Sequence, residues 1–167
     1  MRIYRHVFVL DTCLDVIIAE SKKVRFKETG GPLVGYISND HALVITGATG
    51  PGPKAELSRY SVVIDGEFAQ KFCDEMYSAS SGKLDYVGDW HRHTGWSLEP
   101  SKEDVHAMRT MADFEYCPVK HPVSLIYRKR PAAFKTYVLN AERELDLLSH
   151  SILPARAVWS MIGISDQ

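Results

Sequence analysis

Short strand-like segments alternate with helix-like segments along the whole chain, and this alternation restricts the fold more than any other feature of the sequence. Apolar runs such as IYRHVFVL (residues 3–10) and LDYVGDWHRH (84–93) suit strands, whereas SKEDVHAMRTMADF (101–114) repeats apolar residues at helical spacing. No internal repeat, low-complexity block or linker interrupts the pattern. The sequence therefore predicts an α/β fold of the α+β type.

The same patterns place the other elements up to residue 140. PLVGYIS (32–38) and HALVITGA (41–48) are separated by Asn39-Asp40, which suits a hairpin between two strands. The turn-rich segment TGPGPKAELSRY (49–60) is expected to be a mobile loop. A helix should begin at Asp65, with its apolar stripe in the core, and two more strands should follow the helix at 101–114. The stripe consists of Phe68, Phe72 and Met76, and the two strands are HPVSLIYR (121–128) and AAFKTYVLN (132–140).

The length of the chain suits one domain, because 167 residues with 45% hydrophobic side chains can bury a sizeable core. We assign residues 1–145 to this domain. Residues 146–167 are expected to form a C-terminal helix and tail that pack on the domain or extend it. The apolar residues that favour a helix in the last part of the chain are Leu145, Leu148, Ile152 and Trp159.

Charge and cysteine content argue against several classes of partner. The chain has 20 Lys and Arg against 21 Asp and Glu, with no long run of either sign, so we expect no nucleic-acid binding. No segment reaches the roughly 18 apolar residues of a membrane helix, and Asp11 and Asp15 interrupt the apolar region that a secretory signal would need. Three widely spaced cysteines without a Cys-x-x-Cys pair suit reduced thiols in a cytoplasmic protein.

The segment DWHRHTGWSLEPSKED (89–104) contains the residues that are best suited to chemistry. His91 and His93 are one residue apart, and seven residues later Ser101-x-x-Asp104 follows. Alternate side chains of a strand share a face, so both imidazoles can point to one place while Arg92 faces the other way. A catalytic zinc site typically has three protein ligands, and Asp104 can be the third.

Each half of this segment also has a purely structural interpretation. A His-x-His pair is commonly a half-buried pair with structural hydrogen bonds. Ser101-x-x-Asp104 at the start of a helical pattern resembles a capping box, with Asp in place of Glu. The cap and the ligand are compatible, because a carboxylate is stable in the first turn of a helix. Glu28, in KETGGPLVG (27–35), is a candidate base, although a Glu before Gly-Gly is usually a surface residue before a turn.

Together, ETGGPLVG and HRHTGWSLEPSKED resemble the JAMM metallopeptidases, also called the MPN-plus or JAB family. The family pattern is a Glu, then His-x-His, seven residues and Ser-x-x-Asp, and the resemblance extends from about residue 5 to about residue 140. It implies the MPN/JAB fold, a curved mixed β-sheet flanked by helices. It also implies the function of each residue in a zinc-dependent metallopeptidase. His91, His93 and Asp104 would bind Zn²⁺, Glu28 would be the general acid/base, and Ser101 would stabilise the oxyanion.

One position departs from the family pattern, because Thr94 follows the second His where the family usually has Pro. More narrowly, TGPGP, DGEF and YVGDWHRH resemble short stand-alone bacterial JAB proteins of antiphage operons, including CBASS and Bil-like systems. This resemblance implies cleavage of the amide bond between a ubiquitin-like or other conjugated protein C-terminus and its target, by deconjugation or precursor processing. E1-like and E2-like enzymes of the operon would be further partners.

Two other functions are compatible with the same residues. One is a JAB peptidase that acts on a small peptide or a sulfur-carrier adduct. The other is a non-catalytic MPN scaffold for protein–protein contacts, although such scaffolds ordinarily lack a ligand or the Glu.

Overall fold

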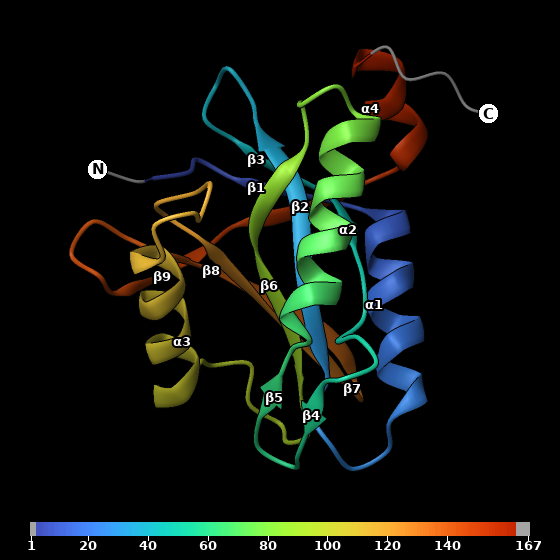
Figure 1. Cartoon of the computed structure of the whole chain (residues 1–167), viewed down its shortest axis with the longest axis vertical. Coiled ribbons are helices and arrows are strands. Elements are labelled where there is room, and N and C mark those ends of the chain that lie inside the picture. Colours follow the sequence, from blue (N-terminus) through green and yellow to red (C-terminus); the bar gives the residue numbers. More distant parts are fainter. Residues whose placement is uncertain (1–2, 163–167) are drawn as a thin grey trace.

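A single large β-sheet organises the molecule, which the computed structural model describes for residues 3–162 (Figure 1). Its elements in chain order are β1 (Val7–Leu10), α1 (Asp11–Lys23), β2 (Gly30–Ile37), β3 (Leu43–Ala48), β4 (Glu56–Leu57), β5 (Val62–Val63), α2 (Gly66–Ala79), β6 (Asp85–His93), α3 (Lys102–Asp113), β7 (Val123–Lys129), β8 (Ala132–Leu139), β9 (Leu145–Leu148), β10 (His150–Leu153) and α4 (Ala155–Ile162).

The large sheet is mixed and has the strand order β10-β1-β3-β2-β6-β7-β8-β9. Consecutive strands β9 and β10 pair with its two opposite edges, since β9 is antiparallel to β8 and β10 is parallel to β1. Only Ser149 separates these two strands, so the sheet must curve until its edges nearly meet. A curved, nearly closed mixed sheet flanked by helices confirms the predicted fold class.

The main hydrophobic core lies between this sheet and α1, which packs on β1, β2, β3 and β7. Cys13, Leu14 and Ile17 are the apolar residues of α1 that are buried there. Trp90 of β6 is fully buried in the same core, as its alternation with His91 predicts. The strand that contains both histidines therefore has one face fixed by the core.

The structure corrects two predictions about the middle of the chain. The segment expected to be a mobile loop, residues 49–60, contains strand β4, which pairs with β5 as a small antiparallel hairpin. Helix α2 begins after Asp65 as predicted, but its stripe of Phe68, Phe72 and Met76 is not core. Phe68 is 37% exposed and the other two are half-buried, because α2 packs on β2 and β6 while most of its other residues face solvent.

The C-terminal segment also differs from the prediction. Leu145, Leu148 and Ile152 belong to the strands β9 and β10, and the helix α4 begins only at Ala155. Long-range pairing with β8 and β1 has replaced the helix that the apolar spacing favoured. Residues 146–153 thus extend the large sheet. The expected tail, residues 163–167, lies outside the described residues. None of the helices within residues 3–162 is long and apolar enough to cross a membrane.

Candidate metal centre

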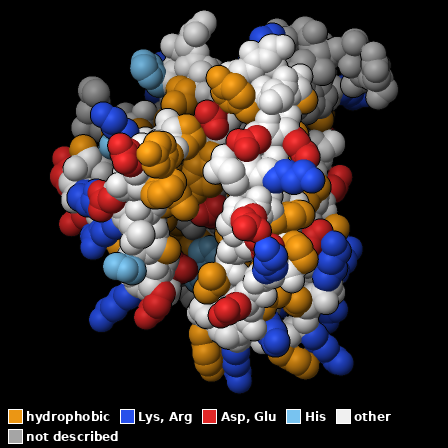
Figure 2. All heavy atoms as spheres, viewed as in Figure 1, with side chains coloured by type: hydrophobic (Ala, Val, Ile, Leu, Met, Phe, Trp, Pro, Cys, Tyr) orange, Lys and Arg blue, Asp and Glu red, His pale blue; other side chains and the backbone are white. Residues whose placement is uncertain are grey.

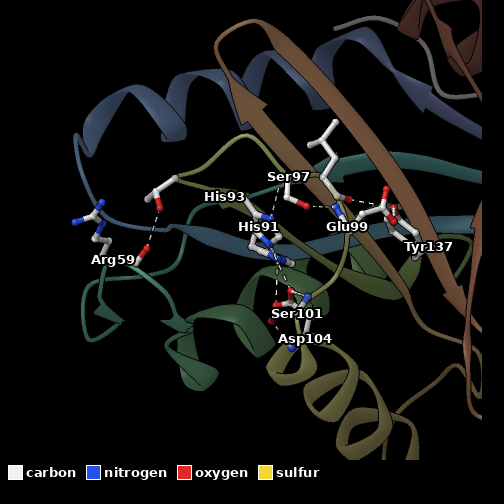
Figure 3. Close-up of polar contacts among 10 residues, drawn as sticks. Arg59, His91, His93, Ser97, Glu99, Ser101, Asp104 and Tyr137 are labelled. Atoms are coloured by element: carbon white, nitrogen blue, oxygen red, sulfur yellow. Dashed lines mark hydrogen bonds and ion pairs between the residues drawn. The ribbon is translucent and has the colours of Figure 1, made fainter.

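Strand β6 brings the two histidines to one place, because it lies in the middle of the large sheet between β2 and β7. Side chains alternate along it as predicted. Trp90 and Arg92 are buried on the side of α1, while His91 and His93 point toward the N-terminal end of α3 (Figure 3). Two neighbouring strands fix the backbone of β6, so the imidazoles are held on a rigid part of the fold.

Three side chains converge at this point, namely His91, His93 and Asp104 (Figure 3). The Nε2 atoms of the two histidines are 2.9 Å apart. The two carboxylate oxygens of Asp104 lie 3.2 Å from Nε2 of His91 and 3.4 Å from Nε2 of His93. Two ligands of a tetrahedral zinc ion, each 2.0–2.1 Å from the metal, would be about 3.3 Å apart. The spacing of these donor atoms therefore fits zinc.

The hydrogen bonding of His93 also suits a metal ligand. Its Nδ1 lies 3.0 Å from the backbone carbonyl oxygen of Ser97. A carbonyl can only accept, so Nδ1 must carry the proton and donate it. The lone pair of the neutral ring is then on Nε2, the atom that faces His91 and Asp104. A backbone carbonyl that orients the second ring nitrogen is a common partner of metal-binding histidines.

Asp104 and Ser101 form the predicted capping box and face the histidines at the same time. The Ser101 Oγ accepts a hydrogen bond from the Asp104 backbone N–H at 3.1 Å, and Asp104 Oδ2 accepts one from the Ser101 backbone N–H at 2.7 Å. The cap holds the Asp104 carboxylate at the first turn of α3, where it points to the imidazoles. The structural and the metal-binding interpretations of Ser-x-x-Asp are therefore both compatible with the geometry.

Charges in this cluster depend strongly on each other. Burial raises the pKa of Asp104, but hydrogen bonds to His91 and His93 outweigh burial and hold this pKa well below its usual range. Burial is the largest single effect on the pKa of His93 and lowers it, but the hydrogen bonds to Asp104 and the Ser97 carbonyl and the negative charges of Asp104 and Glu28 together outweigh burial, so this pKa is raised. The lowered pKa keeps the Asp104 carboxylate ionised, which is the form that can bind a metal ion.

Glu28 lies beside the cluster, just before β2. Strand β2 is antiparallel to β6 with Gly30 opposite His91, and the Arg92 backbone N–H donates to the Thr29 carbonyl at 2.7 Å. The strands approach so closely that a Cβ on Gly30 would lie 2.3 Å from the Trp90 carbonyl oxygen. The Gly-Gly of the motif therefore permits the pairing that places Glu28 near His93.

The Glu28 side chain is 9% exposed and has no hydrogen-bond or ion-pair partner among residues 3–162. Burial raises its pKa above the usual value, although the neighbouring His91 and His93 oppose this shift. A carboxylate of raised basicity that is not engaged elsewhere is suited to accept a proton.

Arg92 is a site residue whose role the sequence did not predict. It is 2% exposed, and its guanidinium donates to the carbonyls of Ser21 at 2.7 Å, Val24 at 2.9 Å and Lys27. These carbonyls lie at the end of α1 and in the segment that leads to Glu28. The sequence contains a signal for this role. Arg92 lies between two candidate ligands, and the alternation of the strand places this charged residue on the core face, where it needs partners.

Glu28 lines two hollows. One has a volume of about 570 Å³ and is lined by Glu28 and His93 together with Arg25, Arg59 and Tyr60. The other, of about 250 Å³, runs between β5 and α3 and is lined by His91 and Asp104 together with mostly apolar side chains. Figure 2 shows a cleft between α3 and α2 in which hydrophobic side chains gather and a histidine is visible. The candidate centre is therefore accessible from two sides.

Comparisons with known proteins indicate the class to which this site belongs. A family model described as prokaryotic homologs of the JAB domain matches residues 11–139. A probable metalloprotease of Sinorhizobium fredii is 30% identical over 122 residues, which are 72% of this chain and 74% of that protein. A CD-NTase/cGAS isopeptidase of Enterobacter hormaechei is 28% identical over 138 residues, which are 81% of this chain and 73% of that protein.

A solved structure is similar in fold. The solution structure of a protein from Desulfitobacterium hafniense matches with a TM-score of 0.67 at 14% identity, and the match covers 89% of this chain and 93% of the other. At this level of identity the similarity concerns the fold alone.

Proposed function

The chain belongs to the family of prokaryotic JAB-domain proteins, and on this basis we propose that it is a zinc-dependent isopeptidase. Its substrate is the amide bond between the C-terminus of a ubiquitin-like or other conjugated protein and its target. The convergence of two imidazole nitrogens and a carboxylate beside the unengaged Glu28 is the main observation that supports this function. The two similar proteins named as a metalloprotease and an isopeptidase support the same reaction class.

In this proposal His91, His93 and Asp104 hold the zinc ion. A zinc ion there supplies Lewis acidity, which polarises a carbonyl group and makes a water molecule more acidic. Glu28 accepts the proton of the attacking water and later donates it to the leaving amine. Burial, which raises the pKa of Glu28, makes this carboxylate a stronger base.

Ser101 stabilises the negative charge that develops on the carbonyl oxygen. Its Oγ accepts the Asp104 N–H, which leaves the hydroxyl proton free to be donated. Because the helix cap already holds this hydroxyl in place, it need not reorient when the negative charge forms on the carbonyl oxygen. Such a pre-positioned donor is the condition for effective electrostatic stabilisation.

The biological setting belongs to the same proposal. We place the protein in the cytoplasm, in bacterial antiphage defence, with E1-like and E2-like enzymes as operon partners. The similarity to a CD-NTase/cGAS isopeptidase supports a conjugated protein as substrate more than a small peptide or a sulfur-carrier adduct. The presence of all three ligands and of Glu28 argues against a non-catalytic scaffold.

Metal content and cleavage of an amide-linked protein fusion test the proposal together. The purified protein should contain about one zinc ion per chain, lose cleavage on chelation and regain it when zinc is added back. Asp104→Ala should lower zinc occupancy, whereas Ser101→Ala should keep the metal and slow turnover by about 10²-fold to 10³-fold. A folded wild-type protein that neither contains nor takes up zinc would contradict the metal site. Equal loss of folding in both variants would favour a purely structural cap.

A further inference from the structure

Two exposed arginines belong to the lining of the larger hollow beside Glu28. Arg25 and Arg59 both line it, and each guanidinium lies over an exposed aromatic ring, 5.1 Å from the ring centre of Phe26 and 5.5 Å from that of Tyr60. Neither arginine forms an ion pair with any residue in 3–162. In Figure 2 basic and hydrophobic side chains alternate at this end of the molecule, where β4 and β5 lie.

Arg59 is held at this position by the backbone around it. It lies in the turn between β4 and β5, and the Glu28 backbone N–H donates to the Ser58 carbonyl in the same turn at 2.7 Å. On the other side, the Thr94 hydroxyl donates to the Arg59 carbonyl at 3.0 Å (Figure 3). A proline, the usual family residue after the second histidine, could not make this bond. The departure from the family pattern therefore adds a contact that holds the turn containing Arg59.

The two hollows differ in charge. Among the described residues, Glu28 is the only acidic side chain that lines the hollow of Arg25 and Arg59. The hollow between β5 and α3 is lined by Asp89, Glu103 and Asp104 in addition to Glu28, and by no Arg or Lys from the part of the chain that the structure describes. An acidic peptide segment would be attracted to the first hollow and repelled by the second.

We propose that the hollow of Arg25 and Arg59 binds an acidic segment of the substrate on one side of the scissile amide bond. Phe26 and Tyr60 supply apolar surface for the aliphatic parts of this segment, while the guanidinium groups pair with its carboxylates. Thr94 acts as a positioning residue for Arg59. This inference rests on the proposed isopeptidase function and specifies the chemistry of its substrate.

Quenched fluorescent peptides with one common scissile amide test the inference. Each carries a Glu-Glu, Ser-Ser or Lys-Lys block on the acyl side or on the amine side of that bond. The zinc-loaded wild type is compared with Arg25→Glu/Arg59→Glu, with Thr94→Val and with the matched control Arg5→Glu/Arg156→Glu. The control changes net charge equally at two exposed arginines outside the hollow.

The wild type should cleave the Glu-Glu peptide of one arrangement about tenfold more efficiently than its Ser-Ser counterpart, because two exposed pairs contribute a few-fold each. Arg25→Glu/Arg59→Glu should reverse this order in favour of Lys-Lys, and the control should keep it. Thr94→Val should weaken the preference while zinc content stays the same. High salt should reduce the preference in the wild type, because these charges are exposed.

Binding of the same peptides to Glu28→Gln, measured by fluorescence anisotropy, separates this inference from the proposed reaction. If no peptide is cleaved but Glu-Glu peptides bind in a way that requires Arg25 and Arg59, the reaction is wrong and the inference holds. If all six peptides are cleaved alike, or bind alike or not at all, the inference is wrong whatever happens to the reaction.

Discussion

Glu28 is a buried carboxylate without a hydrogen-bond or ion-pair partner among residues 3–162. Such a group lowers the stability of the folded protein when it is ionised. The pKa of Glu28 is raised mainly by burial, so folding makes the carboxyl group easier to protonate than it is in the unfolded chain. A carboxyl group of this kind contributes stability below its unfolded pKa and loses it as the pH rises through the folded pKa. At neutral pH the ionised Glu28 should therefore destabilise the metal-free protein.

Replacing Glu28 by Gln should thus raise stability and abolish turnover. In the metal-free protein at pH 7 we expect a Tm increase of about 2–4 °C for each 1 kcal/mol gained. The difference should vanish near pH 4, where Glu28 is protonated. Loss of proton transfer should reduce cleavage by at least about 10²-fold, with zinc content unchanged. Thermal melting at both pH values and cleavage of the fusion measure these effects. Cleavage at the wild-type rate would show that Glu28 is not the base.

Ser101 and Asp104 show how one residue pair can satisfy two requirements. The capping box fixes the beginning of α3, and the same carboxylate faces both imidazoles. The bond from the Ser101 backbone N–H leaves Asp104 with enough acceptor capacity for the cluster, since a carboxylate has about four lone-pair positions. The helix cap therefore also points the Asp104 carboxylate at the two imidazoles, as a metal site would require.

At the scale of elements, Arg92 connects the strand of the candidate ligands to the end of α1. Its guanidinium donates hydrogen bonds to three backbone carbonyls. Two of them belong to Ser21, in the C-terminal turn of α1, and to Val24, the C-cap of this helix. The negative end of the helix dipole stabilises this buried cation. The third carbonyl, of Lys27, directly precedes Glu28, so Arg92 couples the position of Glu28 to that of the imidazoles.

Arg92→Lys should preserve the positive charge but lose the simultaneous hydrogen bonds to the three backbone carbonyls. We expect kcat to fall about 10-fold to 100-fold, because Glu28 is less precisely placed, while KM and zinc content change little. Arg92→Met, which also removes the charge, should lose more stability because the carbonyls keep no partner. Kinetics, metal analysis and melting curves measure these effects. A fall in stability with an unchanged kcat would limit Arg92 to a structural role.

At the scale of the whole molecule, the C-terminal strands close the sheet. β9 covers the β8 edge and β10 covers the β1 edge, and the Ala155 backbone N–H donates to Asp11 Oδ1 at 2.9 Å, which connects α4 to the beginning of α1. Without these strands both edges would be open, and the core beneath β1 would lose its cover. The division into residues 1–145 and 146–167 stays a prediction, but the described segment 146–153 is part of the sheet.

Truncation after residue 144 should therefore remove more than an appendage. We expect the shortened protein to lose its cooperative thermal transition or to melt at least 10 °C lower, since several kcal/mol of strand pairing and burial disappear (roughly 2–4 °C per kcal/mol). The full chain is the reference for this comparison. Hydrogen exchange should show lost protection in β1 and β8. A shortened protein as stable as the full chain would show that residues 1–145 fold alone.

Local periodicity was sufficient to predict much of this protein. A period of two residues places His91 and His93 on one face and Trp90 on the other, and both assignments agree with the structure. The first turn of a helix predicts the position of Asp104 because capping depends on residues only three apart. These features require only neighbours in the sequence, so they survive in any compatible tertiary arrangement.

Features that depend on distant partners could not be predicted in this way. β9 and β10 became strands because β8 and β1 offered unpaired edges, which outweighed the helical spacing of their apolar residues. The hairpin of β4 and β5, the contacts of Arg92 and the position of Arg59 beside Glu28 likewise depend on segments that are far apart in the chain. The sequence thus determined which residues can bind a metal, and the tertiary structure decided what surrounds them, because edge pairing and burial are properties of the assembled sheet.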